Sequence, residues 1–247
     1  MSRPIRAVSA GTASGMNEPT LPLLGLSPVA GKTIVARFDG GLLSSDGGIL
    51  ALREIEHRLG IAGRLAACIE DPRDLDQVTH KLTDIIHFRL LMTAAGYQDG
   101  NDATSPRCDP MFEMALDFAP SGRELCSQST ISRLENLPDI HALLHIGQAM
   151  IDFYCASFHE VPKRMILNID DTFDAVHGSQ QLHLFNAYYD EYGFQPIVVF
   201  DGAGRFLTAM LRPAKRPSGV ENPRLPVQAS ARYPCQLAKD GAPVAGR

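Results

Sequence analysis

The chain has 247 residues and a formal net charge of −5 at pH 7, with 45% hydrophobic and 21% charged residues. This composition is typical of a folded protein with one large or two modest domains. No run of about 18 or more apolar residues occurs, which predicts no membrane span. The five cysteines are scattered, which disfavours a disulfide framework and predicts a reducing, cytoplasmic compartment.

The sequence predicts four regions. Residues 1–33 are expected to form a disordered N-terminal tail, because the stretch Met1–Thr20 has no apolar core. Residues 34–160 are mainly helical after an extended arm over 34–48. A strand-rich domain starts within residues 161–219. Residues 220–247, rich in proline, alanine and glycine, are expected to be disordered because they cannot bury a core.

Apolar residues at helical spacing predict five helices, over residues 49–59, 74–97, 110–118, 127–136 and 139–158. Gly60 and Gly96 are expected to end the first two. The pattern changes at Val161-Pro162. An apolar run from Met165 to Ile169 predicts a strand, and further β segments are expected over 182–189, 195–200 and 206–211, with a hairpin turn at Asp201–Gly204. The predicted fold class is α+β, with a three-stranded antiparallel meander.

Two adjacent acids, Asp170 and Asp171, follow this first strand, with Asp174 close behind. Clustered carboxylates repel one another unless a cation or hydrogen-bond donors stabilise them. Hard oxygen ligands of this kind suit Mg²⁺ together with phosphate oxygens. The pattern therefore indicates phosphoryl chemistry. A turn-rich surface loop with helix-capping acids is the alternative.

The segment Ser127–Arg133 has the side chains of a DNA-reading helix. Ser127, Gln128, Thr130 and Arg133 carry groups that contact phosphates and base edges in other proteins. A solvent-exposed capped helix is the alternative, and the negative net charge counts against a nucleic-acid partner. His141 and His145 have the i,i+4 spacing of a metal pair, but without an intervening HExxH glutamate they are interpreted as surface histidines.

Several motifs, in this order, resemble the DDE transposases of bacterial insertion sequences. The resemblance covers roughly residues 34–219. The motifs are Phe38–Gly41 with Asp46–Gly48, Tyr97–Asp102, Ser127–Asn136, Asn168–Thr172 with His177-Gly178, Phe185–Tyr189, Gly193–Pro196, Val199–Asp201 and Leu211–Pro213.

This resemblance implies a ribonuclease H-like catalytic domain in which Asp170 is the first acid of the DDE triad. Asp171 beside it is a second candidate metal ligand. In this family the triad acids hold two Mg²⁺ ions that activate water or a 3′-hydroxyl and stabilise the leaving oxygen. The implied partner is double-stranded DNA at the terminal inverted repeats of the element, bound with the help of the helical region. A homo-oligomer and no membrane are also expected.

The expected second Asp and the Glu of the triad are not found where the resemblance places them. The family-like pattern stops near Gly219, and a frameshift or premature end explains the different composition of 220–247. The chain alone is therefore expected not to catalyse transposition. Two other functions stay open. The first is a DNA-binding regulator that inhibits the intact transposase. The second is a haloacid-dehalogenase-like phosphatase, in which Asn168 stands where the nucleophilic Asp is required.

Overall fold

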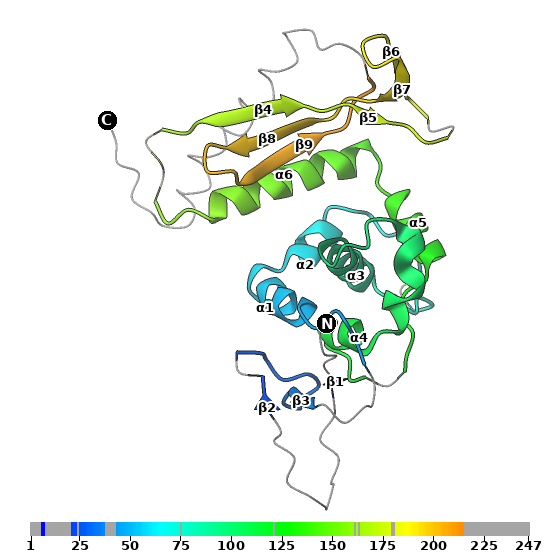
Figure 1. Cartoon of the computed structure of the whole chain (residues 1–247), viewed down its shortest axis with the longest axis vertical. Coiled ribbons are helices and arrows are strands. Elements are labelled where there is room, and N and C mark those ends of the chain that lie inside the picture. Colours follow the sequence, from blue (N-terminus) through cyan, green and yellow to red (C-terminus); the bar gives the residue numbers. More distant parts are fainter. Residues whose placement is uncertain are drawn as a thin grey trace, which may run out of the picture. The chain divides into compact units, whose positions relative to one another are not determined.

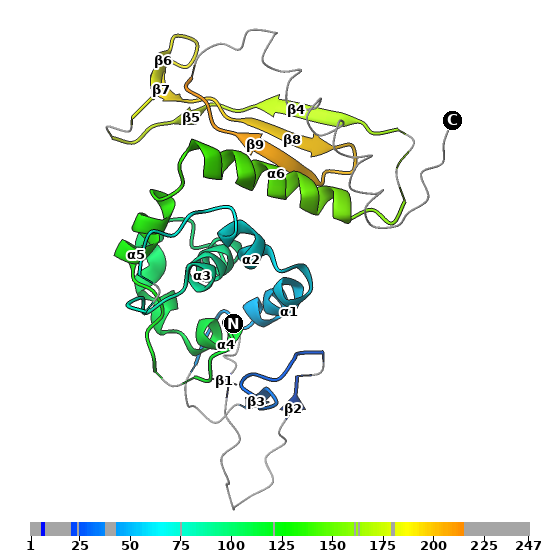
Figure 2. The same cartoon turned by 180° about the vertical axis from the view of Figure 1, so that it is seen from behind.

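The computed structural model describes residues 6–7, 21–23, 25–37, 43–74, 76–120, 122–160, 162, 164–178 and 181–214 (Figures 1 and 2). The chain divides into two compact units, Met1–Ala142 and Leu143–Arg247. The boundary predicted from the sequence lies later, at residue 160. Most of the long helix before that residue therefore falls in the second unit, not the first. The predicted tail over 220–247, the motif Phe38–Gly41 and most of residues 1–20 lie outside the described residues.

Unit 1 begins with a small sheet of β1 (Arg6–Ala7), β3 (Val35–Arg37) and β2 (Leu21–Pro22), in that order and antiparallel. Described strands and turns thus occur within the interval 1–33 that the sequence analysis assigned to a tail. Val29 is buried, and the backbone N–H and hydroxyl of Ser27 donate to the Glu54 carboxylate at 2.8 and 2.7 Å. These contacts hold the segment against the helices.

The first helix ends where the sequence predicts. Helix α1 (Ile49–Leu59) stops at Gly60, whose left-handed backbone (φ 61°) suits glycine. A short helix that the sequence did not predict, α2 (Ile61–Ala66), starts immediately afterwards. Its first N–H groups, from Ile61 and Ala62, donate to the Glu56 carboxylate at 3.0 and 2.8 Å. A side chain of α1 thus caps α2, which local periodicity alone does not reveal.

The predicted start of the second helix was wrong. Helix α3 covers Leu82–Ala94 rather than beginning near Asp74. The Asp74 carboxylate accepts a hydrogen bond from the N–H of Asp76, and the Asp74 carbonyl accepts one from Gln77, which closes a turn. Lys81 is then extended, with ψ 152°. Local bonds from aspartate compete with helix formation, and here they delay it.

The rest of unit 1 consists of short helices around the same core. These are η1 (Gly100–Thr104), η2 (Pro106–Cys108), α4 (Pro110–Ala115) and α5 (Gln128–Glu135). The rings of Phe88 and Phe112 meet edge to face at 5.6 Å between centroids, and both are fully buried. Met92 and Ile131 complete this centre, which fixes α5 against α3.

Unit 2 consists of α6 (Ile140–Ala156, whose first residues belong to unit 1) and two sheets. The larger sheet has the order β4 (Leu167–Asp171), β8 (Ile197–Asp201), β9 (Phe206–Met210), all antiparallel. Helix α6 packs on one face of it, as Figure 1 shows. The core there contains Ile151, Tyr154, Cys155, Ile197, Val199 and Leu207. This confirms the mixed α+β class and the hairpin at Asp201–Gly204.

The predicted segment 182–189 does not join that sheet. It contributes only β6 (Leu184–Asn186), which pairs with β7 (Glu191–Phe194), and β7 also pairs with β5 (Asp174–Ala175). Leu182 and Asp190 have positive φ, and the Asn186 side chain accepts a hydrogen bond from the N–H of Tyr188. These turns break the segment into a small separate sheet.

Candidate functional site

Asp170 and Asp171 lie next to each other on β4 but on opposite faces of the sheet. Successive side chains of a strand alternate between faces, and directly paired antiparallel residues share one. Asp171 pairs with Ile197, which faces α6, whereas Asp170 pairs with Val198 on the other face. The structure therefore does not bring the two predicted metal ligands together.

Asp171 already has cationic and polar partners. Its Oδ2 accepts hydrogen bonds from Nε2 of Gln195 at 3.0 Å and from Nη2 of Arg212 at 3.1 Å. The Arg212 side chain is 12% exposed, so the pair is partly shielded from water. Arg212 thus already balances the charge of Asp171, whose side chain is 40% exposed, and a cation there would have to compete with Arg212.

Asp170 is exposed, as Asp171 is, but forms no hydrogen bond or ion pair with any of the residues that the structure describes. A solvent-facing carboxylate with free lone pairs is the kind of donor that Mg²⁺ accepts alongside water and phosphate oxygens. Asp170 therefore has the chemistry of one ligand for the implied metal, whereas Asp171 is already bonded to Arg212.

The other acids of unit 2 do not complete a metal centre. In the described ranges no three His, Cys, Asp or Glu side chains gather as metal ligands. Asp201, 4% exposed, accepts from the Tyr154 hydroxyl at 3.0 Å and from Nε of Arg205 at 2.8 Å. Burial alone would raise the pKa of Asp201, but the hydrogen bonds from Arg205, Tyr154 and Ala203 lower it. Asp201 is a structural acid of the hairpin turn.

The pairing of β4 counts against the haloacid-dehalogenase-like phosphatase alternative. Asn168 and Asp170 share one face of β4, two residues apart, as a DxD-type motif requires. However, β4 is antiparallel to β8, whereas that enzyme class carries the motif in a parallel sheet. An amide at position 168 also lacks the nucleophilic oxygen of a carboxylate.

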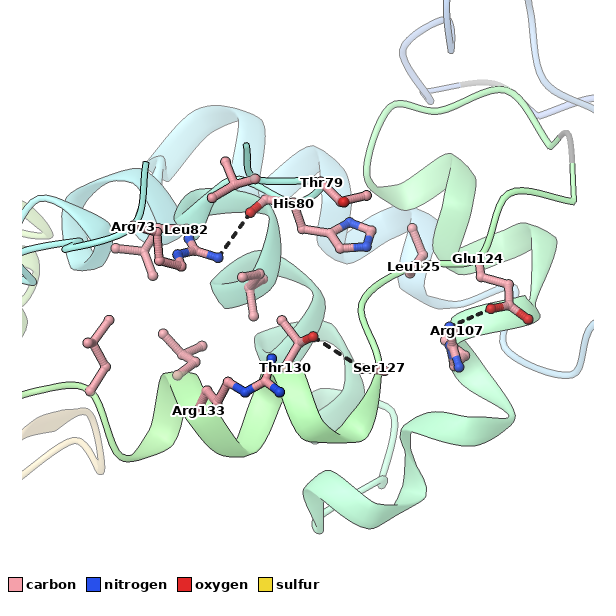
Figure 3. A pocket seen from close by; sticks show the side chains of 14 residues that line it. Arg73, Thr79, His80, Leu82, Arg107, Glu124, Leu125, Ser127, Thr130 and Arg133 are labelled. Atoms are coloured by element: carbon pink, nitrogen blue, oxygen red, sulfur yellow. Dashed lines mark hydrogen bonds and ion pairs between the residues drawn. The ribbon is translucent and has the colours of Figure 1, made fainter. Parts of the chain in front are cut away.

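In unit 1, three of the four residues predicted to bind DNA line one cavity. The cavity has a volume of about 620 Å³. Ser127, Thr130 and Arg133 follow one another at intervals of three, so they share the face of α5 that borders it (Figure 3). Gln128 is exposed on α5 and does not line the cavity.

The other wall brings in basic residues that the sequence reasoning did not single out. Arg73, from the loop after α2, and Arg107, from η2, line the cavity together with His80 (Figure 3). Leu82, Ile85, Leu125 and Leu134 supply apolar surface. No local motif marks Arg73 or Arg107. The two residues are 34 positions apart in the chain, and only the folding of unit 1 brings them to the same cavity. The only sequence signal was the spacing on α5.

The charge within this cavity is positive. Arg73 is paired with Asp71 outside the lining at 2.6 Å, and Arg107 with Glu124 at 2.5 Å. Arg133 forms no hydrogen bond or ion pair within the described part of the chain. Burial lowers the pKa of His80, and the charge of Arg123 lowers it further. Asp84 opposes this shift, and Arg107 and Arg73 add smaller lowering effects.

No helix in the described part of the chain is both long and apolar enough to cross a membrane. Comparison with curated proteins and with solved structures gives no match. The family model described as transposase DDE domain group 1 matches residues 26–237, which extends beyond the interval 34–219 at both ends. Because this match spans most of the chain, the protein belongs to the DDE transposases of group 1.

Proposed function

We propose that this chain acts in DNA transposition, binding DNA through unit 1 and supplying Asp170 as the first acid of a metal-dependent phosphoryl-transfer site. The family match supports the reaction class. The observation that carries the residue assignment is the contrast on β4, where Asp170 has no partner among the described residues and Asp171 is bonded to Arg212.

The sheet is compatible with a ribonuclease H-like domain. In the order β4-β8-β9, the acid-bearing strand lies at an edge of three antiparallel strands, and α6 covers only the face away from Asp170. A phosphate group can therefore approach Asp170 from solvent. Bound Mg²⁺ would polarise the phosphate oxygens and activate the attacking hydroxyl.

Asp170 alone does not build a two-metal site. The described residues place no further pair of acids beside it, so the remaining carboxylates of such a site have to come from elsewhere. We infer that the described units bind DNA without cutting it. The cytoplasmic location and a homo-oligomeric assembly stay predictions from the sequence.

Metal binding tests the assignment of Asp170. Mn²⁺ accepts the same oxygen ligands as Mg²⁺ and broadens nearby NMR signals. Titration of the full chain with Mn²⁺ should broaden the β4 amide signals around residue 170. Asp170→Asn should abolish this effect, and Asp171→Asn, the matched control, should retain it. Retention in Asp170→Asn, or loss in Asp171→Asn alone, would reject the assignment.

A cleavage assay tests the second half of the proposal. A supercoiled plasmid carrying the DNA that flanks the coding sequence should be bound by the chain in Mg²⁺ buffer and remain uncut. Nicking that disappears in Asp170→Asn would show that the chain completes its own site, and the inference of incompleteness would then be wrong.

The basic cavity favours a second candidate function, that of a regulator. It lies wholly within unit 1, so DNA binding there does not need the acids of unit 2. Such a chain would occupy the ends of the element and inhibit an intact transposase. Co-expression with that transposase should lower the transposition frequency, and Arg133→Gln should relieve the inhibition. Unchanged frequency with the wild-type chain would exclude this role.

A further inference from the structure

The cavity of unit 1 differs in charge from the chain as a whole. The chain has a net charge of −5, which disfavours a polyanionic partner. The lining of the cavity, however, contains Arg73, Arg107 and Arg133 and one acid, Glu124. Asp71, outside the lining, pairs with Arg73, and Glu124 pairs with Arg107, so Arg133 carries the charge that no described acid balances. Positive charge is therefore concentrated in this cavity, which can bind an anion although the net charge of the whole chain is negative.

Two of these arginines retain donor capacity. Arg133 has no partner among the described residues, so its whole guanidinium is available. Arg107 donates to Glu124 through Nη2, while its Nε is buried without a hydrogen-bond partner. An unsatisfied buried donor is costly, so a small rotation of the Arg107 guanidinium toward an anion in the cavity would be favourable. Guanidinium groups match the geometry of phosphate oxygens and hold them by two parallel bonds.

The rest of the lining narrows the chemistry of the ligand. Thr79, Ser127 and Thr130 add hydroxyl groups to the lining, and the hydroxyls of Ser127 and Thr130 lie 3.1 Å apart in a hydrogen bond. Leu82, Ile85 and Leu134 form an apolar part that cannot bind charge. A cavity of about 620 Å³ is too large for an isolated ion and accommodates an anion attached to a less polar group. A phosphate with its sugar has this combination.

We propose that the cavity binds a phosphate group of the DNA backbone, with Arg133 and Arg107 as charged donors and the apolar part against the adjoining sugar. This inference rests on the proposed function only in naming DNA as the source of the phosphate. Helix α5 then has two roles. Its cavity face anchors the backbone, and Gln128, exposed outside the cavity, is free to contact base edges.

Salt dependence of DNA binding tests this division. Each phosphate contact contributes about 0.9 to the slope of log K against log salt concentration. Fluorescence anisotropy of a labelled duplex with the full chain should show several-fold weaker binding by Arg133→Gln on every sequence, with the slope reduced by about 1. Arg58→Gln is the matched control, because Arg58 is exposed on α1 in the same unit and does not line the cavity. It should leave the slope unchanged.

Gln128→Ala provides the complementary variant on the same helix. It should keep the wild-type slope and change only the preference among sequences. If the wild-type chain binds DNA and Arg133→Gln has the wild-type slope, the phosphate site is wrong while the proposed function stands. If the wild-type chain shows no salt-dependent DNA binding, the proposed function fails.

Free phosphate compounds distinguish the source of the ligand. Calorimetric titration with inorganic phosphate and with dAMP should give only weak, millimolar-range binding that Arg133→Gln reduces further. Micromolar binding of dAMP would overturn the assignment to the DNA backbone and identify a mononucleotide site instead. Binding of either compound that is unchanged in Arg133→Gln would place the anion outside this cavity and contradict the inference.

Discussion

The Asp171 carboxylate accepts a hydrogen bond from the Arg212 guanidinium at 3.1 Å, across 41 residues of sequence. The bond connects the end of β4 to the segment that follows β9. It gives Asp171 a role in the architecture of unit 2, whereas its neighbour Asp170 contacts solvent on the other face. Adjacent acids with the same chemistry thus have different surroundings because a strand alternates its side chains.

The first prediction concerns the stability of unit 2. Asp171→Asn removes the charge that Arg212 faces, and since Arg212 is only 12% exposed, this should lower the free energy of unfolding by about 1 kcal/mol. Asp170→Asn should leave it unchanged within a few tenths of a kcal/mol, about the usual range for a surface substitution. Urea unfolding of both variants provides the comparison. Equal losses would contradict the difference between the two faces.

A second prediction concerns Arg53, which is 1% exposed in unit 1. Its guanidinium donates to the Asp117 carboxylate, to Glu54 and to the carbonyls of Ser27 and Pro28. Arg53→Ala removes these bonds and leaves a cavity, so it should destabilise unit 1 by about 3 kcal/mol. Arg58→Ala, on the exposed side of α1, is the control. Similar urea midpoints for the two variants would rule out a structural role for the Arg53 network.

Cysteine reactivity is a third prediction. The four described cysteines are free. Burial raises the pKa of the Cys126 thiol to about 12 and that of Cys155 to about 11. Since the thiolate is the reactive species, both should resist alkylation at pH 8 in the folded chain, while exposed Cys108 reacts. Mass spectrometry after iodoacetamide treatment distinguishes the sites. Rapid labelling of Cys126 or Cys155 under native conditions would be inconsistent with their burial.

The fourth prediction concerns the pH dependence of unit 1. Burial is the main cause that lowers the pKa of both His80 and His87. Between these lowered pKa values and the ordinary value of about 6.5, the unfolded chain binds more protons than the folded one. The free energy of unfolding should therefore rise with pH through this window. The stability that the two neutral histidines contribute is lost as pH falls through their lowered pKa values.

NMR titration of the His80 ring provides the measurement. Its midpoint should lie below the ordinary value, and Arg123→Gln should raise it, because Arg123 is the leading charge that opposes protonation. Arg58→Gln serves as the control for the loss of one positive charge elsewhere in unit 1. A His80 midpoint at or above the ordinary value would contradict the positive environment of the cavity.

Local chemistry explains which parts of the fold were predictable. Gly60 ended α1 as expected, because glycine adopts the left-handed conformation at a helix end without steric cost and needs no distant contact to do so. The start of α3 was missed, since the bonds of Asp74 to its neighbours compete with a helical pattern that is otherwise continuous. Turns at Leu182 and Asp190 broke a segment whose β propensity had suggested one strand.

The candidate sites show the same limit. Asp170 was found because a strand and its acids are contiguous in the sequence. Its separation from Asp171 follows from the alternation of side chains along β4, and the pairing register, which makes Ile197 the partner of Asp171, decides which of the two faces α6. The arginines of the cavity were missed, because Arg73 and Arg107 meet α5 only through the packing of unit 1. Contacts between segments that are distant in the sequence cannot be predicted from a local pattern of residues.

Recognition of the DNA that flanks the coding sequence tests the central claim most directly. In a competition gel shift near physiological salt, the full chain should prefer a fragment containing the element's terminal repeats over a random duplex of equal length. Specific complexes of this kind are tighter than non-specific ones by about 10³-fold or more. A random duplex that competes equally well, or the absence of any complex, would contradict a role in transposition.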